Sequence, residues 1–310
     1  MAAAEEFTYL ANDGTSLYVN KWTVESVGRP RAVIQIAHGM AEHIKRYDNF
    51  ARFLVRHGFS VYGNDHRGHG RLAERNGTYG YFSDENGFDK VVDDMLLVTE
   101  RIQSENPDTP VFLFGHSLGS FLARRYIQLY GEKLSGVILS GTGGDSGVSV
   151  KVAKMIARAE SRIRGRKAPS PLMTKLTFGA YNKKFKPSLT EYDWLSRDNE
   201  EVRKYIEDPL CGSECSAGFF IDLFEGLELI NDKKNIRKTP ESLPVYIFSG
   251  DKDPVGNDTK GIRQVYGAFQ EAGLENVELK FYEGGRHEML NETNREEVHQ
   301  DILAWLEKHL

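Results

Sequence analysis

The chain has 310 residues, and its 40 Lys and Arg against 45 Asp and Glu give a formal net charge of −5. A composition of 40% hydrophobic and 27% charged residues is ordinary for a soluble globular protein with a sizeable core, and the acidic balance excludes nucleic-acid binding driven by overall charge. The chain has no apolar run near the about 18 residues of a membrane span, no basic and apolar leader at its start, and only two cysteines, which predicts a cytoplasmic protein without a disulfide scaffold.

Short apolar runs and helical patterns alternate through the first part of the chain. The runs are apolar throughout and stop at Gly or at turn residues, as expected of strands buried on both faces. This alternation predicts an α/β fold with a mostly parallel sheet that is covered by helices on both faces. The predicted strands span residues 32–37, 59–62, 111–114, 136–140, 244–248 and 277–282, and helical patterns cover 47–57, 91–102, 122–129 and 298–306.

The alternation of strands and helices stops after Gly141 and resumes at the strand that begins at Pro244. Between them, residues 143–240 show helical and loop-like patterns and no strong strand. A segment of this length is too long for a structureless loop in a compact domain. We therefore predict a core formed by residues 1–142 and 241–310, with residues 143–240 as a helical cap inserted between two late strands.

A candidate nucleophile lies where the strand at 111–114 meets the following helix. Residues 115–119 read Gly-His-Ser-Leu-Gly, and no other serine in the chain has this G-x-S-x-G setting. An apolar strand before the serine and a helix after it are the context of a nucleophile elbow, in which the flanking glycines avoid clashes. Ser117 is the predicted nucleophile, and the alternative is an ordinary glycine-rich turn.

A serine needs a base, and the base needs a group that orients it. His287 follows a late strand on a Gly-rich loop, where reacting groups gather in parallel sheets, whereas His299 and His309 belong to the final helix. The loop at 249–254 offers two carboxylates. We favour Asp253, which lies deeper in that loop beside a proline, over Asp251.

An oxyanion hole requires two backbone N–H groups aimed at the developing negative charge. Leu118 supplies one because it begins a helix, where the amides are unpaired and the dipole favours an anion. The turn after the first predicted strand reads His38-Gly39-Met40, so Met40 is expected to supply the other. The sequence here departs from the HGGG form of many esterases.

Other combinations of ligand-type residues are weaker candidates for a site. Asp65, His66 and His69 form one short cluster without a distant matching ligand set, so a metal is not expected there. Cys211 and Cys215 lack a second pair of ligands. No phosphate-binding glycine motif follows a strand, so nucleotide binding has no support. Taken together with the acidic net charge, these observations predict no metal, no other cofactor and no nucleic acid.

One cap segment is more apolar than a single core-facing stripe requires. It carries Phe219, Phe220, Leu223 and Phe224, followed by Leu227 and Ile230. These side chains line an acyl-binding pocket in one interpretation, and pack the cap onto the core in the other.

The early cap is strongly basic, with 11 Lys and Arg against 2 acidic residues between positions 145 and 190. Lys151, Lys154, Arg158 and Arg162 recur at helical spacing on one face, whereas Val152, Met155, Ile156, Ala159 and Ile163 fall largely on another. A basic amphipathic helix of this kind can lie on an anionic lipid surface, which suggests peripheral contact with the inner membrane face. The alternative is a solvated face that balances the acidic core.

Several motifs together resemble the monoacylglycerol lipase and lysophospholipase branch of the α/β-hydrolases, whose bacterial members are often described as serine aminopeptidase-like. The order Ser117, Asp253, His287 is the order of that superfamily and differs from those of chymotrypsin and subtilisin. The resemblance also implies Asp253 as the acid, fourth in its Gly-x-x-Asp pattern. The motifs lie at residues 38–43, 64–70, 115–119, 249–253 and 285–288, with similar cap text at 195–198 and 207–210.

The residues and the resemblance predict a serine hydrolase that cleaves carboxylic esters of monoacylglycerol or lysophospholipid through an acyl-enzyme. The first alternative is a proline iminopeptidase-like aminopeptidase, which needs cap carboxylates for the substrate amine. Asp145 and Glu160 alone stand against the basic early cap, although Glu191 and Asp193 follow it. A ligand-binding protein that lost turnover is the second alternative, disfavoured because all three candidate triad residues are present.

Overall fold

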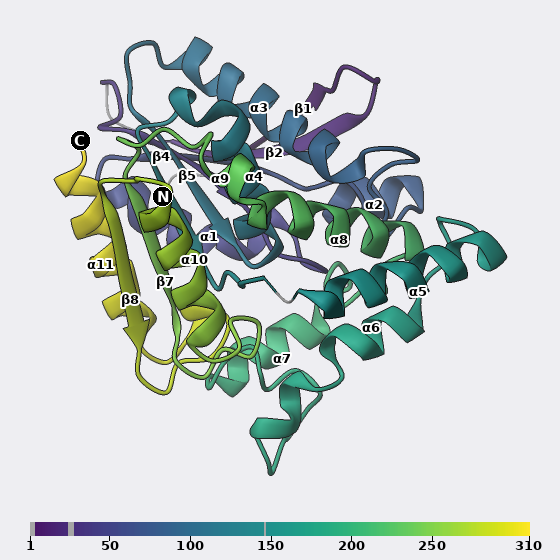
Figure 1. Ribbon diagram of the computed structural model, residues 1–310. Coiled ribbons are helices and arrows are strands. Elements are labelled where there is room, and N and C mark those ends of the chain that lie inside the picture. Colours follow the sequence, from purple (N-terminus) through teal and green to yellow (C-terminus); the bar gives the residue numbers. More distant parts are fainter. Residues whose placement is uncertain (1–3, 24–27, 146) are drawn as a thin grey trace.

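The computed structural model describes residues 4–23, 28–145 and 147–310. Within these residues, one eight-stranded sheet has the order β1-β2-β4-β3-β5-β6-β7-β8 (Figure 1). β1 and β2 form an antiparallel hairpin, β2 pairs antiparallel with β4, and all other pairs are parallel. The predicted mostly parallel sheet is confirmed. The strands are β1 (Glu5–Leu10), β2 (Ser16–Trp22), β3 (Val33–Ala37), β4 (Ser60–Asn64), β5 (Val111–His116), β6 (Gly136–Ser140), β7 (Val245–Gly250) and β8 (Val277–Tyr282).

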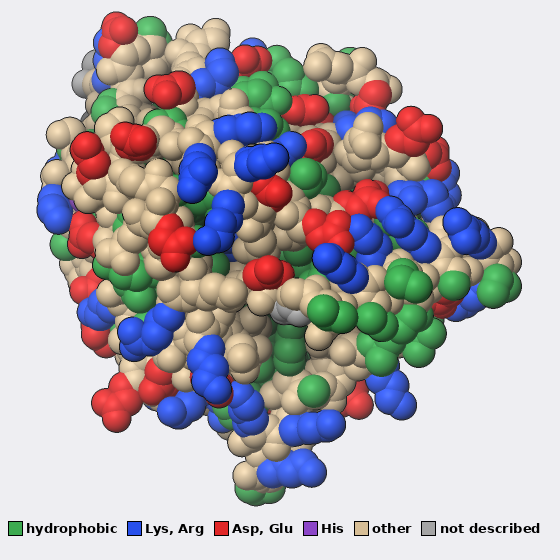
Figure 2. Space-filling view, in the orientation of Figure 1, with side chains coloured by type: hydrophobic (Ala, Val, Ile, Leu, Met, Phe, Trp, Pro, Cys, Tyr) green, Lys and Arg blue, Asp and Glu red, His purple; other side chains and the backbone are tan. Residues whose placement is uncertain are grey.

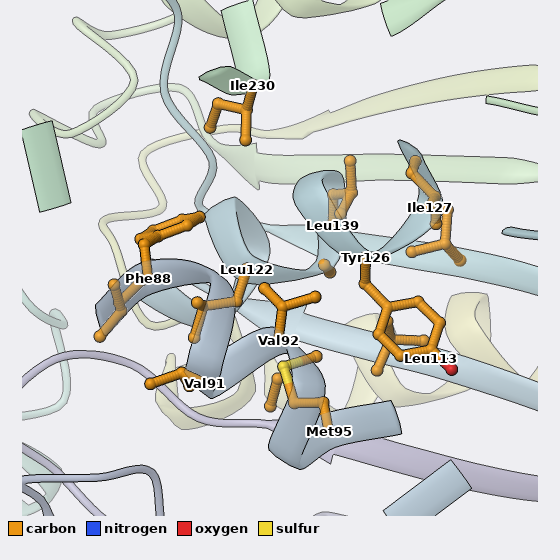
Figure 3. Packing of buried hydrophobic residues seen from close by; sticks show 14 of the residues in the cluster. Phe88, Val91, Val92, Met95, Leu113, Leu122, Tyr126, Ile127, Leu139 and Ile230 are labelled. Atoms are coloured by element: carbon orange, nitrogen blue, oxygen red, sulfur yellow. The ribbon is translucent and has the colours of Figure 1, made fainter. Parts of the chain in front are cut away.

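Helices cover both faces of the sheet, as predicted. Neighbouring residues of β5 point to opposite faces: Leu113 belongs to one buried cluster, and Phe112 and Phe114 belong to the other. The first cluster packs α3, α4 and α10 on the sheet, and Figure 3 shows part of it around Leu113 and Tyr126. The second packs α1 and α11. These helices are α1 (Asp48–Arg56), α3 (Gly87–Glu105), α4 (Leu118–Tyr130), α10 (Lys260–Glu271) and α11 (Arg295–Lys308), with the short α2 (Gly70–Asn76) after β4.

The chain between β6 and β7 is helical in the structure, as the sequence predicts. We call residues 143–240 the cap segment, and its exact limits stay a prediction. Among the described residues, no helix is both long and apolar enough to cross a lipid bilayer. The helices of the cap segment are α5 (Val148–Arg164), α6 (Pro171–Phe178), α7 (Asn199–Glu207), α8 (Ala217–Asn231) and the short α9 (Lys233–Ile236).

The cap helix α8 packs against α5 as well as against α3 and α4. Its residues Phe219, Phe220, Leu223 and Phe224 are all buried, and the Phe219 ring lies 4.8 Å from that of Phe82. A helix that carries apolar residues beyond one stripe buries them against several neighbours. Their burial favours the packing interpretation, and these four residues are not among those that line the cavity described below; their role in substrate binding stays a prediction.

Candidate active site

The turn between β5 and α4 holds Ser117 in a backbone conformation that few non-glycine residues adopt. Its φ is 52° and its ψ is −119°, a strained geometry of the kind that clusters at active sites. A Cβ atom at Gly115 would overlap the carbonyl of Gly119, and one at Gly119 would overlap the carbonyl of Ala37. Both glycines of the motif are thus required by close backbone approach, and they hold the elbow at the carboxyl end of the sheet.

His287 and Asp253 come together from the loops that follow β8 and β7. The His287 Nδ1 lies 2.9 Å from Asp253 Oδ1 and 3.0 Å from Oδ2. Asp253 also accepts hydrogen bonds from the Ser249 hydroxyl at 2.8 Å and the Val255 amide at 2.9 Å. Both members of the pair are buried. The carboxylate is thereby fixed on the imidazole, the arrangement that orients a catalytic base.

The pair is electrostatically coupled. Burial on its own favours the neutral imidazole, but the adjacent Asp253 carboxylate outweighs it and raises the pKa of His287. Burial likewise disfavours the charged carboxylate, yet His287 and the hydrogen bonds from Ser249 and Val255 lower the pKa of Asp253. Asp253 therefore favours the imidazolium that a base forms when it accepts a proton.

The other aspartate of this loop, Asp251, has a different set of partners. Its Oδ1 accepts the Gly284 amide at 2.8 Å, and its Oδ2 lies 3.3 Å from the Lys252 ammonium. These contacts brace the turn after β8 and leave His287 to Asp253.

Ser117 and His287 both line one cavity of about 560 Å³. Gly39, Met40 and His116 also line it, so the candidate oxyanion donor Met40 borders the same space as Ser117. Leu118 begins α4, and its amide lies in the first turn of the helix, where backbone N–H groups have no partner within the helix. The structure thus brings Ser117, His287 and Met40 around a single space, and Leu118 directly follows Ser117 in the chain.

The cap segment supplies the rest of the cavity wall, from residues that the sequence analysis did not assign to the site. The Trp194 ring lies 5.1 Å from the His287 ring, and the Glu288 amide donates to the Leu195 carbonyl at 2.7 Å. The nearest sequence signal is the family-like text at 195–198, which begins at this contact. The large side chains of the wall are Phe178, Tyr192, Trp194, Leu195 and Tyr205.

The sequence analysis did not predict one buried polar network near the site. We call it the loop network, and it consists of Glu42, Arg46, Tyr47 and Glu288. Glu42 accepts the amide of Gly39, the Tyr47 hydroxyl at 2.8 Å and the Arg46 guanidinium at 2.6 Å. Arg46 also forms two 2.7 Å hydrogen bonds to Glu288, the neighbour of His287. Burial would raise the pKa of Glu288, but Arg46 lowers it to about 2. The network joins the turn at Gly39 and Met40, which we call the oxyanion loop, to Glu288 beside the candidate base His287.

Neutralising one end of the loop network is expected to slow turnover. Glu42→Gln removes one of the two carboxylates that hold Arg46 and loosens the Gly39–Met40 turn, and misplacement of about 1 Å near reacting groups can cost up to about 100-fold in rate. We expect a lower kcat with little change in KM, measured by initial rates on a soluble ester. Lys204→Ala, which breaks the exposed ion pair with Glu201, is the control and should leave kcat unchanged. An equal loss in both variants would contradict the positioning role.

The Asp65, His66 and His69 cluster lies behind the site as part of the core. Asp65 accepts the Ile44 and Arg71 amides, each at 3.0 Å, and so fixes two chain turns. Burial lowers the pKa of His66 to about 3 and that of His69 to about 4, which keeps both rings neutral. Backbone hydrogen bonds thus account for Asp65, and the His69 Nδ1 lies 2.9 Å from the Arg67 carbonyl, whereas the ring nitrogens of His66 and the Nε2 of His69 are buried without a hydrogen-bond partner among the described residues.

The cavity wall and the α8 core are expected to respond differently to truncation. Phe178→Ala opens the cavity and should alter the preferred acyl length, whereas Phe220→Ala leaves a hole in the core and should cost about 3–5 kcal/mol of stability. Urea unfolding and rates on esters of graded chain length measure the two effects. A changed chain-length profile in a fully stable Phe220→Ala protein would instead show that α8 lines the acyl pocket.

Comparisons with known proteins agree with this geometry. The family described as "Serine aminopeptidase, S33" matches residues 28–294. A monoacylglycerol lipase of Mycolicibacterium smegmatis is 29% identical over 98% of both chains, and the monoglyceride lipase of Rattus norvegicus is 29% identical over 97% of this chain and 90% of its own. A solved carboxyl esterase from Bacillus coagulans, crystallised with glycerol, superposes with a TM-score of 0.90 at 28% identity over 99% of both chains.

These relatives confirm the resemblance to the monoacylglycerol lipase-like branch. They also establish the general chemistry, because the matched lipases and esterases hydrolyse carboxylic esters and the matches cover nearly the whole chain. The chain therefore belongs to the serine aminopeptidase S33 family of α/β-hydrolases and is a carboxylic ester hydrolase.

Proposed function

We propose that this hydrolase cleaves monoacylglycerols with Ser117 as nucleophile, His287 as general base and Asp253 as its orienting acid. The observation that carries the proposal is that a strained Ser117 and an Asp253-bound His287 line one cavity. At about 560 Å³, that cavity falls within the range of small-molecule sites, and its aromatic and aliphatic wall suits an acyl chain. The names of the relatives support glycerol monoesters as substrates.

The proposed reaction follows from the placement of these groups. His287 takes the Ser117 proton as the hydroxyl oxygen attacks the ester carbonyl, and the amides of Met40 and Leu118 receive the oxyanion. His287 then protonates the departing glycerol oxygen, which leaves an acyl group on Ser117. Water, deprotonated by the same imidazole, releases the fatty acid and restores the serine.

Two other substrate classes remain in the proposal as alternatives. A lysophospholipid presents the same acyl ester with a charged head group. An aminopeptidase substrate needs a free carboxylate for its α-amino group, and Asp193 is already occupied by the Leu189 and Thr190 amides at 2.6 and 3.0 Å. Glu42 and Glu288 are held by Arg46, which leaves Glu191 as the acidic wall residue open to such a role.

A substrate panel tests this choice. Initial rates on monoacylglycerols, lysophospholipids, short p-nitrophenyl esters and proline amides are compared at equal concentration. The proposal expects the highest kcat/KM on a monoacylglycerol and none on proline amides. A higher kcat/KM on a lysophospholipid would show that the preferred substrate carries a charged head group. Glu191-dependent cleavage of proline amides would overturn the esterase preference.

We further propose that the mouth of the cavity docks on an anionic lipid surface. Large apolar side chains on α5 and α6 are 49–85% exposed, and Figure 2 shows them gathered beside Lys and Arg side chains. The α6 helix borders both this surface and the cavity, so a lipid ester could pass from one to the other. Two unpaired thiols, Cys211 and Cys215, support a reducing compartment and hence the cytoplasmic membrane face. We call this surface the apolar ridge: Val148, Val152, Met155, Ile163, Leu172 and Leu176.

The structure divides the basic residues of α5 into two groups. Lys154 and Arg158 form ion pairs with Glu228 and Glu225 of α8, the latter at 2.7 Å, so they hold α5 on α8. Their assignment as lipid contacts is therefore revised. Lys151 and Arg162 of α5 and Lys175 of α6 are exposed and take that role.

Vesicle binding checks the docking surface. We expect the protein to sediment with anionic vesicles, weakly with neutral ones, and less at high salt, because each basic residue adds about 1 kcal/mol near an anionic surface. Met155→Glu and Lys151→Glu should each reduce binding, whereas Leu10→Glu, at an exposed apolar position on β1, is the matched control. Equal, negligible binding of the wild type to both vesicle types would leave the apolar ridge without this partner.

A further inference from the structure

Three side chains of different ligand type converge beside the oxyanion loop, outside the residues assigned to catalysis. The His43 Nε2 lies 2.9 Å from Asp208 Oδ2, and one ligand atom from each of His43, Asp208 and Cys211 lies within 4.8 Å of the others. His43 is buried, and the other two are half-buried. We propose that these three residues form a binding site for a zinc-like divalent cation.

The donor set decides the class of cation. Imidazole, thiolate and carboxylate together suit Zn²⁺, whereas Ca²⁺ and Mg²⁺ prefer oxygen ligands alone. Zn²⁺ bonds of about 2.0–2.3 Å place tetrahedral ligand atoms roughly 3.3–3.8 Å apart. The three atoms are close enough that small side-chain rotations reach this spacing. Three protein ligands leave the fourth position to water.

The surroundings of the cluster favour a positive ion and orient one ligand. The Arg46 guanidinium is nearby, but Glu42 and Glu288 neutralise it through hydrogen bonds of 2.6 and 2.7 Å. The Asp208 carboxylate then leaves an excess of negative charge. Its other oxygen accepts the Leu210 amide at 2.8 Å, which fixes the plane of the carboxylate as an outer-shell partner does in metal sites.

The position of the site gives it a structural consequence. Asp208 and Cys211 lie in the turn after α7, and that turn already contacts the oxyanion loop: the Gly212 amide donates to the Ala41 carbonyl at 2.9 Å. The Tyr205 hydroxyl donates to the same carbonyl at 3.0 Å. A cation held between His43 and this turn would fasten the cap segment to the loop that carries Met40. This inference does not depend on the proposed substrate.

Metal binding to the full chain tests the site directly. Metal-free protein is titrated with Zn²⁺ against a chromophoric chelator and separately with Co²⁺, whose thiolate complex has a near-ultraviolet charge-transfer band. We expect one Zn²⁺ per chain, a Co²⁺–thiolate band, and a melting temperature that rises with Zn²⁺ concentration. Cys211→Ser and Asp208→Asn should each weaken binding by at least about 100-fold, since even loss of an outer-shell partner can cost that much.

Cys215→Ser is the matched control, because Cys215 is the other thiol of the chain and lies outside the cluster. It should retain the Zn²⁺ affinity and the Co²⁺ band of the wild type. Circular dichroism of the metal-free variants shows whether each is folded before titration. Absence of a Co²⁺–thiolate band in the folded wild type, or an equal loss of affinity in Cys215→Ser, would overturn the site and leave His43 and Asp208 as a simple hydrogen-bonded pair.

Discussion

Ser117→Ala is expected to lower ester turnover by about 10⁴–10⁶-fold, the largest effect of any single substitution in this chain. Without the hydroxyl, His287 has no bound nucleophile to deprotonate, and only the oxyanion donors and substrate binding remain. His287→Ala should lose activity to a similar extent, because the two groups act as a unit. Single-turnover and steady-state rates on one soluble ester measure the loss.

Two controls separate chemistry from folding. Ser213, which lines the same cavity, is a matched serine, and Ser213→Ala should change kcat by less than about tenfold. A fluorophosphonate probe should label the wild type and Ser213→Ala but not Ser117→Ala, while all three unfold at similar temperatures. Undiminished labelling of Ser117→Ala would identify a different nucleophile.

The elbow could be predicted from sequence because its requirements are local. An apolar strand, two glycines at fixed spacing and a helix start all lie within residues 111–130, where Ser117 has its strained backbone conformation. The parallel strands were equally visible, because burial on both faces makes them apolar throughout. The hairpin of β1 and β2 was not predicted, because β1 is exposed along one side and carries a weak hydrophobic pattern.

The residues of the cavity wall could not be predicted because they follow no hydrophobic repeat in the sequence. Phe178 ends a helix and stacks on Trp194, which lies in an irregular segment, and the approach of Trp194 to His287 depends on how the cap segment lies over the sheet. The apolar α8 gave the stronger sequence signal, but that signal reports burial on all sides and not contact with a ligand. Tertiary packing alone distinguishes the two.

Charge patterns had the same limit. Glu42 and Arg46 are four residues apart and predict a local pair, but Glu288 joins them from 242 positions away from Arg46. In α5, helical spacing grouped Lys154 and Arg158 with Lys151, whereas their partners on α8 separate them. A spacing rule identifies which residues share a face, and only the structure shows what that face meets.

The two aspartates after β7 provide the second large expected effect. Asp253→Asn should reduce kcat by about 10⁴-fold, because the carboxamide can donate to His287 Nδ1 and so favours the wrong tautomer, and it no longer stabilises the imidazolium. Asp251→Asn should cost less than about tenfold, since its carboxamide oxygen can still accept the Gly284 amide. Rates on one ester, with melting temperatures for both variants, give the ranking.

The pH dependence of the residual activity distinguishes loss of the orienting carboxylate from general damage. The proposed reaction needs neutral His287, so wild-type activity is expected to rise as pH increases through the pKa that Asp253 raises. In Asp253→Asn this raising interaction is gone, burial remains, and the rise in residual activity should move to lower pH. Asp251→Asn should keep the wild-type profile. If instead Asp251→Asn were the severe variant and shifted the profile, Asp251 would be the acid, and the contacts of 2.9 and 3.0 Å between His287 and Asp253 would have no catalytic role.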